Sequence, residues 1–219
     1  MDRDFGFAPN PFHNLCTLAT CKPRIRRVAK EADWIIGMGG SRLKATGRCI
    51  FAMRVSRSIT FDEYWRNPLY RDKKPVRNGS KKMIVGDNIY HQTTPGNWEQ
   101  LNSHHSNPDG SPNTHNLTND TQANAVLVSE YFFYFGGAAI EVPQDILQRI
   151  KYVNRRNHRT FSVAEAQPLI SYIETNFKPN RLLDDPFDFE SASSRYSVEN
   201  NKVTIDDRVA TGLYQKKNL

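Results

Sequence analysis

Apolar residues cluster in three segments whose composition predicts β-strands. Residues 32–40 ("ADWIIGMGG") and 48–59 ("RCIFAMRVSRSI") are rich in β-branched and aromatic side chains, and a loop of glycine, serine and cations separates them. Two such segments predict an antiparallel hairpin. Residues 125–137 ("AVLVSEYFFYFGG") carry the strongest further strand pattern. We expect 125–135 to join the same sheet.

Apolar residues at helical spacing predict peripheral helices in two other segments, and a helix N-terminal pattern predicts a short third helix. A serine or threonine followed three residues later by glutamate is typical of a helix N-terminus. Thr60 with Glu63, and Ser162 with Glu165, fit this pattern. The predicted helices are residues 60–65, 142–153 and 162–177.

Long polar connections separate these elements, at residues 66–82 and 92–121. Connections of this length are usually functional or mobile. Together the elements predict an α+β fold: a small, bent, mainly antiparallel β-barrel with peripheral helices and long loops. We expect a domain over residues 1–178 and a C-terminal extension over 179–219, docked on the sheet through a strand at 201–207.

The three cysteines, at positions 16, 21 and 49, are an odd number without zinc-ligand spacing. We interpret them as reduced thiols of a cytosolic protein. The sequence also lacks an 18-residue apolar window and the charge order of a signal peptide. These patterns predict a cytoplasmic protein with no membrane partner, and we expect neither a metal nor a cofactor.

Charge is divided unevenly along the chain. Residues 22–82 contain 17 Lys and Arg against 5 Asp and Glu, whereas residues 83–148 contain 7 acidic residues and no Lys or Arg. The basic segment is typical of a phosphate-binding surface, although most charged segments are only solvated. The acidic segment is a candidate protein-facing surface. The candidate phosphate ligands are Lys22, Arg24, Arg26, Arg27, Arg42 and Lys44.

Two other motifs carry candidate chemistry. The glycine-rich segment 37–47 leads into a predicted strand and lacks the ending of a P-loop, so we interpret it as a hairpin loop. The segment 103–115 offers His104, His105, Asp109 and His115. Such a cluster suits a metal or proton transfer, but adjacent histidines in a flexible loop point apart, which favours hydrogen-bonding or solvent-exposed roles.

No Ser-His-Asp or Cys-His arrangement is visible in the sequence. Cys16 and Cys21 are candidate nucleophiles only beside a base. The sequence does not place such a base.

Seven blocks in order resemble the nucleotide modification associated domain 2 family over about residues 4–160: "DFGFAPNPF", "CTLATCKPRIRR", "DWIIGMGGS", "IFAMRVSRSITFDEYW", "GDNIYH", "FFYFGG" and "NHRT". That family is named for its genomic association with DNA base hypermodification in phages and bacteria. The resemblance implies this setting more firmly than any reaction. The hairpin pattern is also similar to PUA-like barrels (ASCH, EVE and YTH domains), where the corresponding hairpin lies beside a nucleotide or modified-base pocket. By that analogy Trp34 is a candidate pocket wall, with a core position as the alternative.

The family setting gives the segment 5–27 a functional interpretation. Pro9 and Pro11 stiffen a loop that presents aromatic rings suited to stacking on a base. The side-chain amide between the two prolines is suited to hydrogen bonds with the edge of that base. The alternative is a structural loop with its aromatic residues in the core. The candidate base contacts here are Phe5, Asn10, Phe12 and Thr17.

We expect the loops 37–48, 6–12 and 103–110 to converge on one pocket, joined by His158 and Arg159 of "NHRT". The favoured function is a binding module for a modified or flipped nucleotide, with nucleic acid or a nucleotide as partner. One alternative is an enzyme of nucleotide modification that uses the histidine-rich loop, with Asp109 or His158 as acid or base. The other is a structural partner of further proteins in a modification or defence complex.

Overall fold

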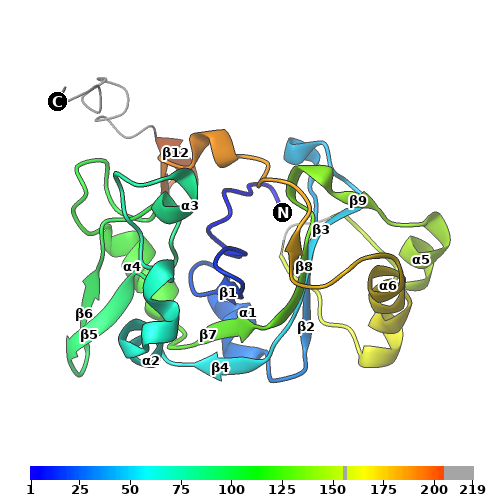
Figure 1. Cartoon of the computed structure of the whole chain (residues 1–219), viewed down its shortest axis with the longest axis horizontal. Coiled ribbons are helices and arrows are strands. Elements are labelled where there is room, and N and C mark those ends of the chain that lie inside the picture. The colour runs from blue at the N-terminus through cyan, green and yellow to red at the C-terminus, as the bar shows by residue number, and fades with distance from the viewer. Residues whose placement is uncertain (155–156, 205–219) are drawn as a thin grey trace.

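The structure is a computed structural model that describes residues 1–154 and 157–204 (Figure 1). Its larger sheet has the strand order β10, β8, β3, β2, with β9 paired to β3. β3 pairs antiparallel with both β2 and β8, which confirms the predicted hairpin and its third strand. The strands are β2 (Trp34–Met38), β3 (Arg48–Arg54), β8 (Tyr131–Tyr134), β9 (Ile140–Glu141) and β10 (Arg181–Leu182).

The three-stranded sheet has the order β1, β7, β4 and shares two chain segments with the larger one. The predicted strand 48–59 divides into β3 and β4, and the predicted strand 125–135 divides into β7 and β8, so each segment bends and passes from one sheet to the other. This confirms the bent, antiparallel part of the prediction. The strands are β1 (Cys16–Leu18), β4 (Arg57–Ile59) and β7 (Val126–Ser129).

Barrel closure is not confirmed. Across the described ranges, the strands form separate sheets of five, three, two and two strands. The two-stranded sheets are β5 with β6 and β11 with β12. Their bounds are β5 (Tyr90–Thr94), β6 (Asn97–Gln100), β11 (Arg195–Ser197) and β12 (Lys202–Thr204).

The predicted helices are present, and both capping boxes form. The Thr60 hydroxyl accepts from the Glu63 N–H, and the Ser162 hydroxyl accepts from the Glu165 N–H. α5 and α6 pack on the five-stranded sheet, on the right of Figure 1. α2 and α4 lie on the left of Figure 1, near β5 and β6. The helices are α1 (Pro23–Val28), α2 (Phe61–Arg66), α3 (Lys81–Ile84), α4 (Thr114–Thr121), α5 (Gln144–Arg149) and α6 (Val163–Asn176), with shorter turns η1 (Ser41–Leu43), η2 (Pro68–Lys73), η3 (Gly136–Ala138) and η4 (Phe189–Ser191).

The long polar connections are more ordered than the sequence predicts. Residues 66–82 contain η2 and the start of α3, and residues 92–121 contain most of the β5–β6 hairpin and α4. Between that hairpin and α4, residues 103–106 are buried. Their polarity serves hydrogen bonds inside the protein, which hydropathy alone does not distinguish from solvent exposure.

Residues beyond 178 contribute to the fold. β10 pairs parallel with β8, and Val203 of β12 packs against the cluster that contains Phe5 and Phe7. The predicted strand at 201–207 is therefore present in part, paired with β11 and not with the larger sheets. Its residues 205–207 lie outside the described residues. Across residues 1–154 and 157–204, no helix combines the length and the apolar character that a membrane crossing requires.

Candidate functional site

Cys21 lies just beyond the end of β1, where the chain turns into α1. Its backbone has φ 54°, in the left-handed region that is uncommon for a residue with a side chain, and its side chain is half-buried. The Cys21 Sγ lies 3.5 Å from Nε2 of His105. The structure therefore supplies the imidazole beside a cysteine that the sequence did not place.

His105 lies in the connection between β6 and α4 and is only 2% exposed. Its Nδ1 is 2.8 Å from Oδ2 of Asp120, near the C-terminal end of α4. Because a carboxylate accepts hydrogen bonds, Nδ1 donates and Nε2 faces the sulfur. Sulfur, imidazole and carboxylate thus form one chain, the arrangement of a nucleophile, its base and the group that orients the base.

Asp120 is held in place by donors from two other segments. Its Oδ1 accepts from the backbone N–H of Cys21 at 2.7 Å, and its Oδ2 accepts from the Tyr90 hydroxyl at 2.9 Å. Burial alone raises the pKa of Asp120, but the charge of His105, its hydrogen bond and the charge of Arg26 lower this pKa below the ordinary range. The carboxylate is therefore ionised at neutral pH.

The pKa of His105 is shifted in the opposite direction. Burial alone lowers the pKa of the imidazole, but the charges and hydrogen bonds of Cys21 and Asp120 outweigh burial and raise it to about 10. The ring is therefore protonated at neutral pH. A protonated imidazole beside sulfur stabilises the thiolate, which is the nucleophilic form of cysteine.

A buried arginine joins the segments that carry Cys21 and Asp120. Arg26 is 1% exposed and donates to the carbonyls of Cys21 and Asp120, at 2.9 and 2.6 Å. It also donates to the carbonyls of Ala123 and Ala125. The prediction that Arg26 contacts phosphate is corrected, because its guanidinium is committed to four carbonyls inside the protein.

The histidine loop is fixed from both sides. The carbonyl of His105 accepts from the side-chain amides of Gln100 and Asn116, at 3.0 and 2.8 Å. The neighbouring His104 is buried, and its Nδ1 lies 2.6 Å from the Ser194 carbonyl. Burial drives the pKa of His104 well below its ordinary value, so this ring is neutral. The two adjacent histidines therefore have different charge states.

The same three side chains also offer metal-ligand atoms. One ligand atom from each of Cys21, His105 and Asp120 lies within 4.8 Å of the others. The oxygens of Asp120, however, already accept from the Cys21 N–H, the Tyr90 hydroxyl and His105. The donors present fit a hydrogen-bonded triad better than a metal site, since a metal would compete with these bonds.

The predicted base contacts of the segment 5–27 lie in the core. Phe5 and Phe12 are 7% and 3% exposed. Asn10 has no exposed surface: its amide donates to the Val85 carbonyl and its oxygen accepts from the Lys73 ammonium. Thr17 is equally buried and donates to Asp87 at 2.7 Å. The structure thus favours the alternative interpretation of this segment as a structural loop.

Two of the three loops expected to converge pack against each other, and their convergence on one pocket stays a prediction. The rings of Phe5 and Phe7 lie 4.5 and 5.1 Å from the His104 ring, so residues 6–12 and 103–110 pack together. The loop 37–48 contacts the N-terminal residues, because the Arg42 guanidinium donates to the Asp2 carbonyl and pairs with Asp188. Its Lys44 is exposed.

The other predicted site residues are spread over the molecule. Trp34 packs on Tyr131 and Phe133 of the five-stranded sheet. Asp109 is exposed and accepts from Ser111, and Arg159 donates to the Lys151 carbonyl. Binding roles for these residues, and for the exposed His158, Lys22, Arg24 and Arg27, stay predictions.

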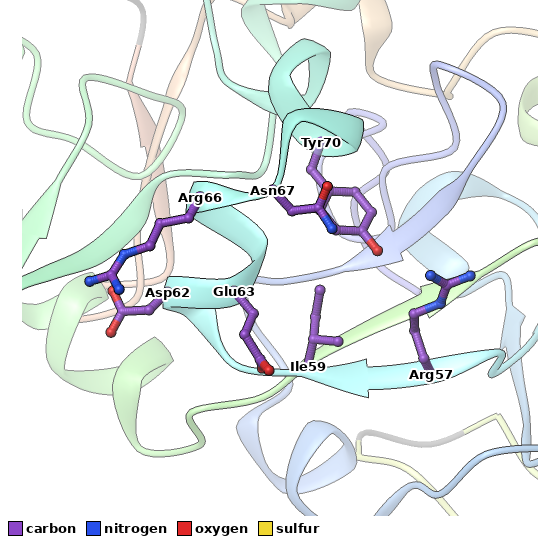
Figure 2. A pocket seen from close by; sticks show the side chains of 7 residues that line it. All are labelled: Arg57, Ile59, Asp62, Glu63, Arg66, Asn67 and Tyr70. Carbon is purple, nitrogen blue, oxygen red and sulfur yellow. The ribbon is translucent and has the colours of Figure 1, made fainter.

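A separate surface pocket of ≈ 440 Å³ lies between α2, η2 and β4 (Figure 2). Figure 2 shows the Tyr70 ring and the Arg57 side chain at this pocket, together with two carboxylates of α2. Those carboxylates are already used, since Glu63 closes its capping box and Asp62 accepts from Gln92. The residues that line this pocket include no cysteine and no histidine, so it has no counterpart of the chain at Cys21.

The family comparison places these residues in context. No curated protein and no solved structure matches the chain. The family model described as nucleotide modification associated domain 2 matches residues 1–193, beyond the range expected from the sequence blocks and including the whole triad. The chain therefore belongs to the nucleotide modification associated domain 2 family.

Proposed function

We propose that the protein is an enzyme of nucleotide modification in which Cys21 is the nucleophile. The observation that carries this proposal is the hydrogen-bonded chain from Cys21 through His105 to Asp120. Three further groups hold its geometry: the Cys21 N–H, the Tyr90 hydroxyl and the Arg26 guanidinium. A thiol that needed only to fill space would not require an oriented, protonated imidazole.

The reaction class that suits this arrangement is transfer at a carbonyl carbon. The thiolate of Cys21 attacks the carbonyl carbon, a carbon–sulfur bond forms, and the bond to the leaving group breaks. The protonated His105 gives its proton to the leaving amine or alcohol, and Asp120 stabilises the ring throughout. Water or an amine then attacks the thioester and gives its proton to His105, and the carbon–sulfur bond breaks to release the thiolate of Cys21 beside the protonated ring.

The family supplies the nucleotide side of the proposal. The matched model is associated with nucleotide modification, so a nucleotide is the expected acyl donor or acceptor. Exposed Lys22 and Arg24 directly follow the nucleophile in sequence and suit a phosphate beside it. The phage or bacterial setting implied by the sequence resemblance is part of this proposal.

The enzyme is better supported than the binding module favoured from sequence. That module depends on base contacts by Asn10 and Phe12, both of which are buried. The histidine-rich loop of the enzyme hypothesis contains His105, and we propose this residue as the base. The acid or base residues expected from the sequence, Asp109 and His158, are replaced by His105, because only this residue has a described contact with a cysteine.

The test is the pH dependence of Cys21 alkylation by iodoacetamide, followed by peptide mass spectrometry. At pH 6 the wild type should react faster than His105→Gln, because the imidazole at 3.5 Å stabilises the attacking sulfur. In His105→Gln the rate should rise by about tenfold per pH unit, as for an ordinary thiol with a pKa near 8.5. Asp120→Asn should lie between the two.

Two outcomes would overturn the proposal. One is a wild-type Cys21 that follows the ordinary thiol profile. The other is a stoichiometric metal in the purified protein whose removal by a chelator is needed before Cys21 reacts, which would make the three side chains a metal site. Circular dichroism of each variant serves as the folding control.

A further inference from the structure

The β11–β12 hairpin borders the cysteine site, although it begins just beyond the residues that the family model matches. The backbone N–H of Tyr196 in β11 donates to the His104 carbonyl at 2.8 Å. This hydrogen bond connects the hairpin to the loop that carries His104 and His105. The hairpin is therefore attached at the segment that carries the base.

A single side chain couples this hairpin to the triad. The amide nitrogen of Asn116 donates to the carbonyls of both His105 and Tyr196, at 2.8 and 2.5 Å. Its amide oxygen accepts from the Val198 N–H at 2.8 Å. Asn116 lies on α4, the helix that carries Asp120, one turn earlier. The hairpin is thus fixed relative to both His105 and Asp120.

This anchoring places the Tyr196 ring beside the imidazoles. Its centroid lies 5.7 Å from that of His105, and it is nearly parallel to His104 at 11° and 6.5 Å. The ring is only half-buried. Burial raises the pKa of the Tyr196 hydroxyl.

A cation accompanies this ring. The guanidinium carbon of Arg3 lies 5.9 Å from the Tyr196 ring centroid, and its Nη2 donates to the Asn201 carbonyl in the hairpin turn. A half-exposed ring with an arginine beside it combines the two groups that proteins use for a nucleotide: an aromatic face for the base and a guanidinium for the phosphate.

We propose that the β11–β12 hairpin forms the substrate-binding wall of the Cys21 site, where Tyr196 stacks on the base and Arg3 binds the phosphate of a nucleotide. This inference rests on the proposed function and adds the specificity element to it. Stacking tolerates any base, so the wall recognises nucleotides as a class and leaves base selection to other groups.

The test is protection of Cys21 from iodoacetamide by the four deoxynucleoside 5′-monophosphates, measured on the full chain. For each variant, the rate with nucleotide is divided by that variant's own unprotected rate. Loss of a stacking partner should raise the half-protecting concentration about tenfold or more in Tyr196→Ala, and little in Tyr196→Phe. In Arg3→Ala, nucleosides and nucleotides should protect equally.

Tyr172→Ala is the matched control, because it removes a half-buried tyrosine from α6, in a different core cluster. It should leave protection unchanged. The inference is overturned if no monophosphate protects the wild type, or if Tyr196→Ala is protected as well as the wild type. Failure of the proposed function looks different: Cys21 then shows the ordinary thiol pH profile without any nucleotide.

Discussion

Cys16 and Cys21 stand five positions apart, and each adjoins a cluster of buried polar side chains. Cys16 lies in β1 with its sulfur 3.8 Å from that of Met53. Burial raises the pKa of its thiol to about 12. Cys21 lies beyond the end of the same strand, half-buried, with the protonated His105 at its sulfur.

The polar cluster near Cys16 is closed on itself. The ammonium of Lys73 donates to the carbonyl and side-chain oxygens of Asn10 and to the Leu15 carbonyl, at 2.8 to 3.0 Å. Asp87 accepts from the hydroxyls of Thr17 and Tyr64, both at 2.7 Å. Every member named here is at most 1% exposed, apart from Leu15. Such a cluster fixes the fold and leaves no group for a substrate.

The cluster at Cys21 contains the same kinds of group but ends differently. Its carboxylate, imidazole and hydroxyl are buried and hydrogen-bonded, and the chain ends on Cys21, a residue that is only partly buried. Comparison of the two clusters indicates that buried, hydrogen-bonded polar side chains do not by themselves mark a functional site. What marks it is an ordered chain of polar groups that ends on an accessible nucleophile.

The largest expected difference is in thiol reactivity. At pH 7 a thiol with a pKa of about 12 is ionised in a fraction of about 10⁻⁵, because 10 raised to 7 − 12 is 10⁻⁵. Iodoacetamide should therefore modify Cys21 at least about 10³ times faster than Cys16. Peptide mass spectrometry of a time course measures both rates in one sample. Comparable alkylation rates of Cys16 and Cys21 in the folded protein would contradict the difference between the two sites. As a control, the two cysteines should react at equal rates in urea.

Removal of the buried cation should break the closed cluster. Lys73→Ala removes the buried cation whose charge lowers the pKa of Asp87, and it removes the hydrogen bonds that the ammonium donates to Asn10 and Leu15. The free energy of unfolding should fall by about 3–5 kcal/mol, as for other buried pairs that lose one partner. Urea denaturation measures it. Lys30→Ala, at an exposed lysine, should change it by less than about 0.5 kcal/mol, and a similar loss in both variants would contradict the structural role of Lys73.

The free energy of unfolding should change with pH in opposite directions at the two clusters. Burial lowers the pKa of Lys73 from 10.5 to about 8, although Asp87 opposes this shift. Between pH 8 and 10.5 the unfolded chain then binds more protons at Lys73, so stability rises with pH. His105, raised from 6.5 to about 10, binds more protons when folded, so its stabilisation is complete below pH 6.5 and is lost as the pH rises to about 10.

Single variants separate these slopes in urea denaturation across pH 6 to 10.5. Lys73→Met should remove the rise above pH 8 and leave the fall due to His105. His105→Gln should remove the fall and leave the rise. A fall that persists unchanged in His105→Gln would show that the imidazole is not the group that titrates.

The smallest expected effect concerns the cations that follow Cys21. Lys22 and Arg24 are exposed, and removing one cation from a phosphate should lower the slope of log affinity against log salt by about 1. The double variant Lys22→Glu, Arg24→Glu should therefore bind a single-stranded oligonucleotide with a shallower slope than the wild type. Arg149→Glu on α5 is the control. An unchanged slope in the double variant would show that Lys22 and Arg24 do not contact phosphate and are only solvated.

Local features of the fold could be predicted from the sequence. The hairpin of β2 and β3, the third strand β8 and the two capping boxes depend on residues that are neighbours in the chain or that share one strand pattern. The sequence predicted a bent sheet, but not the points at which residues 48–59 and 125–135 pass from one sheet to the other. Those points depend on how the two sheets pack, which the local pattern does not specify.

The site itself was decided by tertiary structure. Cys21 and His105 are 84 positions apart, and nothing in the local pattern of either distinguishes a paired side chain from a free one. The positions of the cations in the sequence did not predict which of them are exposed. Arg26 is buried and donates to four carbonyls, whereas Arg24, two positions earlier, is exposed. The sequence alone predicted the hairpin of β2 and β3, the third strand β8, the two capping boxes and the family. Only the folded chain decided which polar groups are enclosed and which sulfur is accessible, because burial and hydrogen bonding depend on residues brought together from distant segments.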